Sequence, residues 1–107
     1  MEKVEDKNPK APRCGTTPLH LAAIKGHLNV CHFILGKVSD LNPKDANGST
    51  PLFKAALYGH FDTCKLIIDK VEDKNPECKS GFMPLFVAAF IGNLNICQYI
   101  MKFIEDK

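Results

Sequence analysis

The chain repeats itself with a fixed period, and this feature limits its fold more than any other. Residues 33 positions apart match three times in register, as Gly15, Gly48 and Gly81 do. The same register aligns prolines, leucines, Ala-Ala pairs, further glycines and the cysteines Cys31, Cys64 and Cys97. One extra residue interrupts it, among Lys10 to Arg13 in the first loop. A period of this length predicts stacked copies of one unit, each contacting only its neighbours.

The first half of each unit predicts a short helix. Thr17-Pro18 and Thr50-Pro51 are typical helix starts, because the threonine oxygen accepts a backbone N–H and proline fits the first turn. In the third unit Met83-Pro84 keeps the proline and loses the capping oxygen. Leucine and the Ala-Ala pair then share one helical face. The helices are expected to end at Gly26, Gly59 and Gly92.

A second helix follows in each unit, starting near Leu28, Phe61 and Leu94. After it comes a polar phrase, VEDKNP at 4–9 and 71–76 and VSDLNP at 38–43, with IEDK at 104–107 as its partial copy. Asn, Asp and Pro favour turns, so the phrase predicts a helix exit and a long connection into the next unit. The chain begins and ends at the same phase of the repeat, as whole units of a longer array would.

The segments GTTPLHLAAIKGHLNV (15–30) and GSTPLFKAALYGHFDT (48–63) resemble the ankyrin repeat, and GFMPLFVAAFIGNLNI (81–96) is a looser match. The resemblance runs from about Pro12 to the end. It implies an all-α ankyrin-repeat solenoid of three helix-turn-helix units with projecting β-hairpin-like loops. The expected organisation is a single domain, 1–107, with repeats at about 12–44, 45–77 and 78–107 after a partial loop at 1–11.

The chain departs from the family at the histidine of the TPLH motif. In the family this ring helps to hydrogen-bond adjoining loops, and here only His20 keeps it. Phe53 and Phe86 stand at the matching positions. These phenyl rings can contribute only by packing.

Composition removes several classes of function. Lys and Arg total 14 against 12 Asp and Glu, and the two signs are interspersed along the sequence. The sequence therefore has no cluster of basic residues of the kind that binding to nucleic-acid phosphates needs. The longest apolar run, LFVAAFI at 85–91, is too short for a membrane span, which takes about 20 residues. The N-terminus has no apolar segment typical of a secretory signal. Five cysteines, an odd number without a framework spacing, favour reduced thiols and an intracellular, cytoplasmic location.

Two Cys–His pairs raise the question of catalysis or metal binding. His27 and Cys31, like His60 and Cys64, are four residues apart, which brings their side chains together on a helix. The pairs recur with the structural period, however, and the third unit has Asn93 instead. We therefore predict no catalytic, cofactor or metal site.

Two pairs of loop residues leave questions open. Cys14 and Cys78 lie in polar loops. Each is either a reactive thiol or an ordinary surface cysteine. Asn42 and Asn75 lie in a loop context that resembles the one in which ankyrin domains are hydroxylated on Asn. The alternative is that each Asn side chain only supplies hydrogen bonds within its own turn.

The resemblance implies a binding surface, because partners of the family usually meet the loop tips and the exposed face of the first helix. Apolar residues prevail on that helix face, where water alone would favour polar ones. Aromatic anchors are common hot spots, so Tyr58, Phe90 and Phe82 are the strongest candidates. The alternative is that these rings pack half-buried under neighbouring loops. The expected contact residues are Arg13, Thr16, Ile24, Lys25, Asn47, Ser49, Leu57, Tyr58, Lys79, Phe82, Phe90 and Ile91, with Cys14, Ala46 and Ser80 beside them in the loops.

The expected function is that of a non-catalytic module that presents a concave surface to another protein. Two alternatives remain open: a scaffolding segment of a longer ankyrin array, and a regulatory domain of a larger enzyme or channel. The last helix, LNICQYIMKFI at 94–104, keeps Tyr99, Met101, Phe103 and Ile104. Since isolated arrays need polar end units, we expect an exposed apolar end, covered by further repeats or by self-association.

Overall fold

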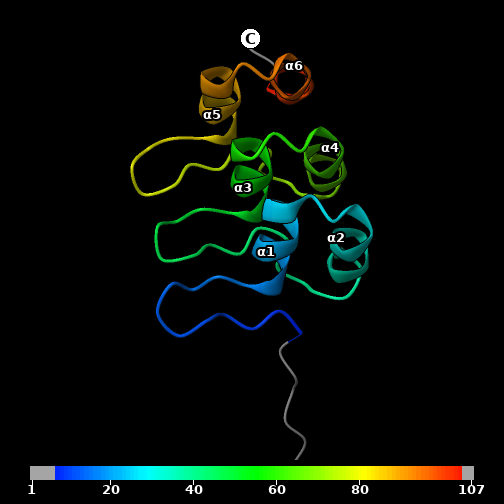
Figure 1. The fold of residues 1–107 in the computed structure, drawn as a ribbon, viewed down its shortest axis with the longest axis vertical. Coiled ribbons are helices and arrows are strands. Elements are labelled where there is room, and N and C mark those ends of the chain that lie inside the picture. Colours follow the sequence, from blue (N-terminus) through cyan, green and yellow to red (C-terminus); the bar gives the residue numbers. More distant parts are fainter. Residues whose placement is uncertain (1–6, 105–107) are drawn as a thin grey trace, which may run out of the picture.

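The computed structural model describes residues 7–104. The opening residues of the partial first loop (1–6), with the start of the first polar phrase, and the end of the last phrase (105–107) lie outside it. The described chain forms six helices in two parallel columns (Figure 1). The first column contains α1 (Pro18–Lys25), α3 (Pro51–Leu57) and α5 (Pro84–Ile91). The second contains α2 (Leu28–Leu35), α4 (Phe61–Lys70) and α6 (Leu94–Phe103).

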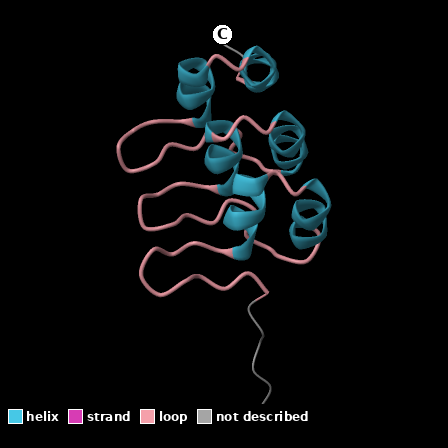
Figure 2. Cartoon of the chain, in the orientation of Figure 1, coloured by secondary structure: helices cyan, strands magenta, loops and turns pink. Residues whose placement is uncertain are grey.

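The molecule is elongated, with extents of 49 × 29 × 26 Å. Each helix contacts its partner within the unit and the corresponding helix of the next unit. Long loops project from the side of the first column, and residues 7–104 contain no strand (Figure 2). The predicted all-α solenoid is therefore confirmed. The unit boundaries that we assign remain a prediction.

Local chemistry explains where the first helices start and stop. The hydroxyl oxygen of Thr17 accepts the N–H of His20, and that of Thr50 accepts the N–H of Phe53, each at 3.2 Å. Met83 makes no such bond at the start of α5. Gly26 ends α1 in the left-handed conformation, with φ 71°, which costs glycine little. The starts agree with the sequence, as do the stops at Gly26 and Gly92, whereas α3 ends one residue earlier than expected, with Tyr58 rather than Gly59 as its C-cap.

Asn residues of the polar phrase stabilise the first helices in a way that the sequence did not reveal. The side-chain oxygen of Asn75 accepts the N–H of Leu85, in the first turn of α5, at 3.0 Å. Asn8 does the same for Leu19 at 3.1 Å. The backbone N–H of Asn75 in turn donates to Asp73, 3.2 Å away. In the first and third units the phrase is thus a turn and also part of the cap of the helix that follows, whereas the side-chain oxygen of Asn42 makes no such bond.

The projecting loops close through backbone bonds. Asp45 donates to the carbonyl of Ser49 at 2.9 Å and Cys78 to that of Phe82 at 2.8 Å. In the first loop Ala11 donates to Thr16, so the extra residue lies inside that turn. Neighbouring loops are also joined, because Ala46 donates to the carbonyl of Cys14 at 2.7 Å and Lys79 to that of Asn47 at 2.9 Å.

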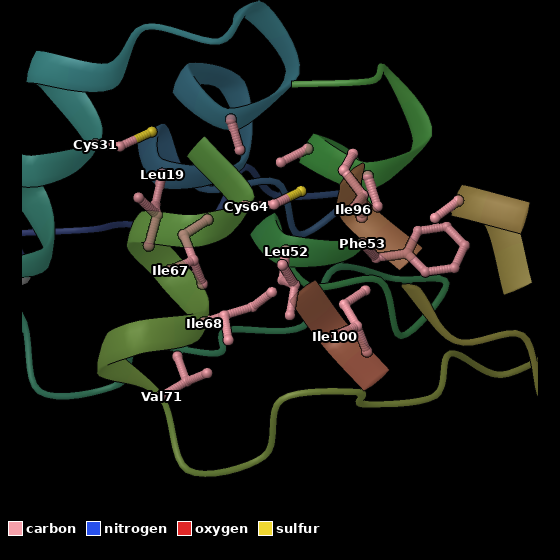
Figure 3. Close-up of a cluster of buried hydrophobic side chains, with 14 of the residues drawn as sticks. Leu19, Cys31, Leu52, Phe53, Cys64, Ile67, Ile68, Val71, Ile96 and Ile100 are labelled. Atoms are coloured by element: carbon pink, nitrogen blue, oxygen red, sulfur yellow. The ribbon is translucent and has the colours of Figure 1, made fainter. Parts of the chain in front are cut away.

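One apolar core runs the length of the stack between the two columns (Figure 3). The small Ala-Ala pairs let the first helices approach closely, while branched residues of the second helices fill the remaining space. Cys31 and Cys64 are buried in this core, and Cys97 is partly buried. The largest aliphatic side chains that are fully enclosed are Leu19, Leu52, Ile67, Ile68, Ile96 and Ile100.

The position of the TPLH histidine behaves differently in each repeat. His20 is fully buried, and its Nε2 donates to the carbonyl oxygen of Ser49, 2.7 Å away in the next loop. Phe53 packs in the core with 9% of its surface exposed. Phe86 is 49% exposed and touches the ring of Phe82, at 5.8 Å between centroids. In the second repeat the buried ring of Phe53 takes the place of the histidine hydrogen bond. In the third repeat Phe86 does so only in part, because half of its surface is exposed.

Candidate functional site

The last turns of the first helices carry a row of exposed side chains. Tyr58 is 54% exposed and Phe90 is 88% exposed. Leu57 and Ile91 are also exposed, as is Lys25. Ile24, at the matching position of the first repeat, is partly buried. We call Lys25, Leu57, Tyr58, Phe90 and Ile91 the first-helix face.

This face is exposed because of the sequence pattern of its helices. Leucine and the Ala-Ala pair occupy the inward side of α1 and α3, so the residues that follow the pair point outward. The alternative, in which the aromatic rings pack under neighbouring loops, does not hold for Tyr58 or Phe90, since both are more than half exposed. Large apolar side chains grouped on a surface mark sites of interaction.

The loop residues divide into accessible and inaccessible ones. Arg13, Asn47 and Lys79 are exposed, and Phe82 is 52% exposed. Thr16 is partly buried.

Ser49 is buried, which removes its side chain from the surface that we expected it to share. The reason is its backbone: the carbonyl accepts from His20, and the N–H donates to Asp45 Oδ1 at 2.9 Å. Both bonds hold this residue inside the loop.

Positive charge surrounds the accessible loop tips. A hollow between the first two loops contains Lys10, Arg13 and Lys44 together with Asp45. Lys54 lies 3.8 Å from Asp45 and partly neutralises that carboxylate. The charged side chains that line this hollow are therefore mainly basic.

The cysteines of the two Cys–His pairs are buried. Burial raises the pKa of Cys31 to about 11 and that of Cys64 to about 12. Such thiols stay protonated at neutral pH, and the thiolate is the nucleophile. His60 places its Nε2 2.9 Å from the carbonyl oxygen of Ile24, so its ring links the second repeat to the first. Among residues 7–104, no group of three or more His, Cys, Asp or Glu side chains is arranged to hold a metal ion.

The loop cysteines have a different environment from the buried ones. Cys14 is exposed, and hydrogen bonds from the side chain and backbone of Thr16 lower its pKa. Partial burial raises the pKa of Cys78, but hydrogen bonds from Ser80 and Phe82 outweigh this and the net shift is downward. All five cysteines of the chain are free thiols.

The opposite side of the stack has a hollow that sequence reasoning missed. It lies between α2 and α4. Only the stacking of two repeats creates this hollow, so no single-repeat pattern could indicate it. Its lining residues are Leu28, Asn29, His32, Asp62, Lys65, Leu66 and Asp69.

The apolar end of the stack is exposed, as expected. Met101 is 57% and Phe103 40% exposed on α6. Tyr99 is partly buried, and its hydroxyl donates to Asp69 on α4. Ile104, directly after α6, is also exposed.

A family model described as ankyrin repeats (3 copies) matches residues 2–77 and 34–107, so the two matches together span nearly the whole chain. No curated protein matches the chain. Within residues 7–104, each helix is too short or too polar to cross a membrane.

Proposed function

Because the chain belongs to the ankyrin repeat family, whose members are generally protein–protein interaction modules, we propose that it binds another protein through its loop tips and first-helix face. The observation that carries this proposal is the exposure of Tyr58 and Phe90 on successive repeats. Their rings offer large apolar area at positions where a protein facing only water would place polar side chains. The module has no catalysis of its own in this proposal.

The rigidity of the stack favours binding, because the surface is already ordered before a partner docks. Its loops are joined to each other and its core is continuous, so little ordering entropy remains to be lost when a partner docks. Leu57, Tyr58, Phe90 and Ile91 are the apolar anchors of the concave surface. The other contacts that we propose, including Thr16, Ile24, Asn47 and Phe82, border them.

The charges at the edge favour one class of partner. Arg13, Lys25 and Lys79 are exposed, and we propose that they lie at the periphery of the contact with the partner. Complementary charge speeds association and excludes wrong partners. We therefore expect a protein surface with apolar residues at its centre and acidic residues at its periphery, and we place this encounter inside the cell, where the free thiols remain reduced.

The test is affinity capture with matched variants. Tyr58→Ala with Phe90→Ala removes two rings that are more than half exposed, and truncating interface hot spots typically costs about 2 kcal/mol or more. The control is His32→Ala with Gln98→Ala, two exposed positions on the second helices. Proteins captured by wild type and control but lost by the double variant support this face. An unchanged set of captured proteins, with the fold intact by circular dichroism, contradicts it.

A scaffolding role is the second candidate, since the apolar end around Met101 is exposed. In that role the molecule would be a spacer, held at its end by further repeats or by copies of itself. Capture of the same proteins by wild type and by the Tyr58, Phe90 double variant would favour this candidate over the first.

A further inference from the structure

The junctions between repeats inside the molecule show which faces of a repeat its two neighbours cover. α1 packs on α3 as α3 packs on α5, and α2 packs on α4 as α4 packs on α6. Each repeat therefore has one face that its successor covers and another that its predecessor covers. A position that is buried in some repeats and exposed in an end repeat reveals which face it belongs to.

The face normally covered by a successor is open on the third repeat. Leu35 and Ile68 are at most 4% exposed, whereas Met101, at the same position of the last repeat, is 57% exposed. Phe86 is open where Phe53 is covered. Ala89 is exposed in the same way. We call Phe86, Ala89 and Met101 the C-terminal end face.

The face normally covered by a predecessor is open on the first repeat. Val30 is 47% exposed, whereas the matching Ile96 is fully buried. Leu21 is exposed where Val87 is buried. Ile34 is only partly buried, although its counterparts are enclosed in the core. We call Leu21, Val30 and Ile34 the N-terminal end face.

Polar groups at the ends match the bonds that join the internal repeats. His60 bonds to the carbonyl oxygen of Ile24 in the preceding repeat. By the period, His27 would bond in the same way to Phe90 of a preceding copy, and His27 is exposed.

The loop ladder continues by the same rule. Lys79 donates to the carbonyl of Asn47. The corresponding donor and acceptor at the ends are the N–H of Arg13 and the carbonyl of Ser80, and both residues are exposed. The apolar fit and the hydrogen-bond register thus point to the same partner.

We propose that a second copy of this chain binds head to tail, with its N-terminal end face on the C-terminal end face of the first. The interface would reproduce the junctions between repeats inside one chain. Because the two faces differ, the contact is heterologous and leaves one free face at each end of every complex. Assembly therefore grows by addition of copies and depends on protein concentration.

Sedimentation velocity of the wild-type chain over a concentration series tests the proposal first. The average mass should rise above the 11.9 kDa of a single chain as concentration increases. Val30→Glu and Met101→Glu each place a charge in one end face, and burying that charge without a partner should weaken association about a hundredfold or more. Both positions face solvent in the single chain, so circular dichroism should be unchanged.

Mixing the two variants gives the decisive result. The Val30→Glu chain keeps its C-terminal end face and the Met101→Glu chain keeps its N-terminal end face. Each alone should be monomeric, and the mixture should form a complex of one copy of each that grows no further. A Tyr58→Glu control, altered only on the first-helix face, should assemble like wild type.

Three outcomes would overturn the proposal. A wild-type chain that stays monomeric throughout the series excludes self-assembly by these faces. A Val30→Glu chain that still dimerises alone indicates that the C-terminal end face pairs with itself. A mixture that stays monomeric while wild type assembles shows that some other surface is used. None of these results bears on partner binding through Tyr58 and Phe90.

Discussion

His20 is the residue whose surroundings restrict its chemistry most. Its Nδ1 accepts the N–H of Thr17 at 3.1 Å, and its Nε2 donates to Ser49. The bond at Nδ1 requires the neutral ring, because a protonated imidazole has no nitrogen left to accept a hydrogen bond. Burial lowers the pKa of this imidazole and outweighs the opposing effects of the Ser49 carbonyl and the Asp45 carboxylate. Protonation would place a second donor against the Thr17 N–H.

This residue should make stability depend on pH. Above about pH 6.5 the ring is neutral in both states and its contribution is complete. As pH falls below that value the unfolded chain takes up a proton first, so the free energy of unfolding decreases until the folded pKa is passed. Urea melts between about pH 7.5 and 5 should show this decrease in the free energy of unfolding. The decrease should be smaller in the His20→Phe variant.

The same substitution should lower stability at neutral pH by about 1 to 3 kcal/mol, because Ser49 and Thr17 lose a partner inside the protein. His32→Gln, on an exposed side chain, is the control and should keep the wild-type pH dependence. If His20→Phe and wild type lost stability equally on acidification, the assignment of the pH dependence to this ring would be wrong.

The cysteines should differ in reactivity by position. The pKa of Cys14 is lowered and its thiol is exposed, whereas burial raises the pKa of Cys31 and Cys64 to about 11 and about 12. Since the thiolate is the reactive form, iodoacetamide should label Cys14 well before the buried pair. Peptide mass spectrometry after short exposure measures this. Equal labelling of Cys14 and Cys31 in the folded protein would contradict the burial that we describe.

At the scale of the element, the start of each first helix decides how well it is capped. Thr50→Ala removes the oxygen that accepts the Phe53 N–H and should cost about 1 kcal/mol. Met83→Thr supplies the missing oxygen to α5 and should stabilise by a similar amount, reduced by loss of the contact between the Asn75 amide and the Met83 sulfur. Denaturant midpoints at unchanged slope measure both. Midpoints equal to wild type in both variants would refute the assigned caps.

The helices were predictable from sequence because their signals are local. Thr-Pro starts and glycine stops act within one turn, so the sequence located α1 and α3 by their own residues. The cap at α6 was missed: Asn93 accepts the N–H of Ile96 at 3.1 Å, while His27 and His60 make no such bond. In the sequence pattern Asn93 stands out only because it replaces the histidine of the Cys–His pairs.

The loops and the site were less predictable because they depend on neighbouring repeats. Ser49 matches exposed loop positions in sequence, yet bonds from His20 and to Asp45 hold it inside. The hollow between α2 and α4 likewise requires two stacked units. Exposure of Tyr58 and Phe90 was predictable, since it follows from the side of the helix that the Ala-Ala pair buries.

At the scale of the whole molecule, the repeat separates two kinds of surface. The end faces are open because the stack has ends (Figure 1). The first-helix face instead has exposed side chains in each of the three repeats. The end faces suit copies of the same unit. The first-helix face carries large exposed apolar side chains, and we propose that it binds a different protein.

The most direct test of this account is NMR of the ¹⁵N-labelled chain, titrated with a protein that affinity capture identifies. The predicted result is that amide shifts concentrate in the last turns of α1, α3 and α5 and in the loop tips near Arg13, Asn47 and Lys79. Shifts concentrated instead at His32, Lys65 and Asp69, around the hollow between α2 and α4, would contradict it.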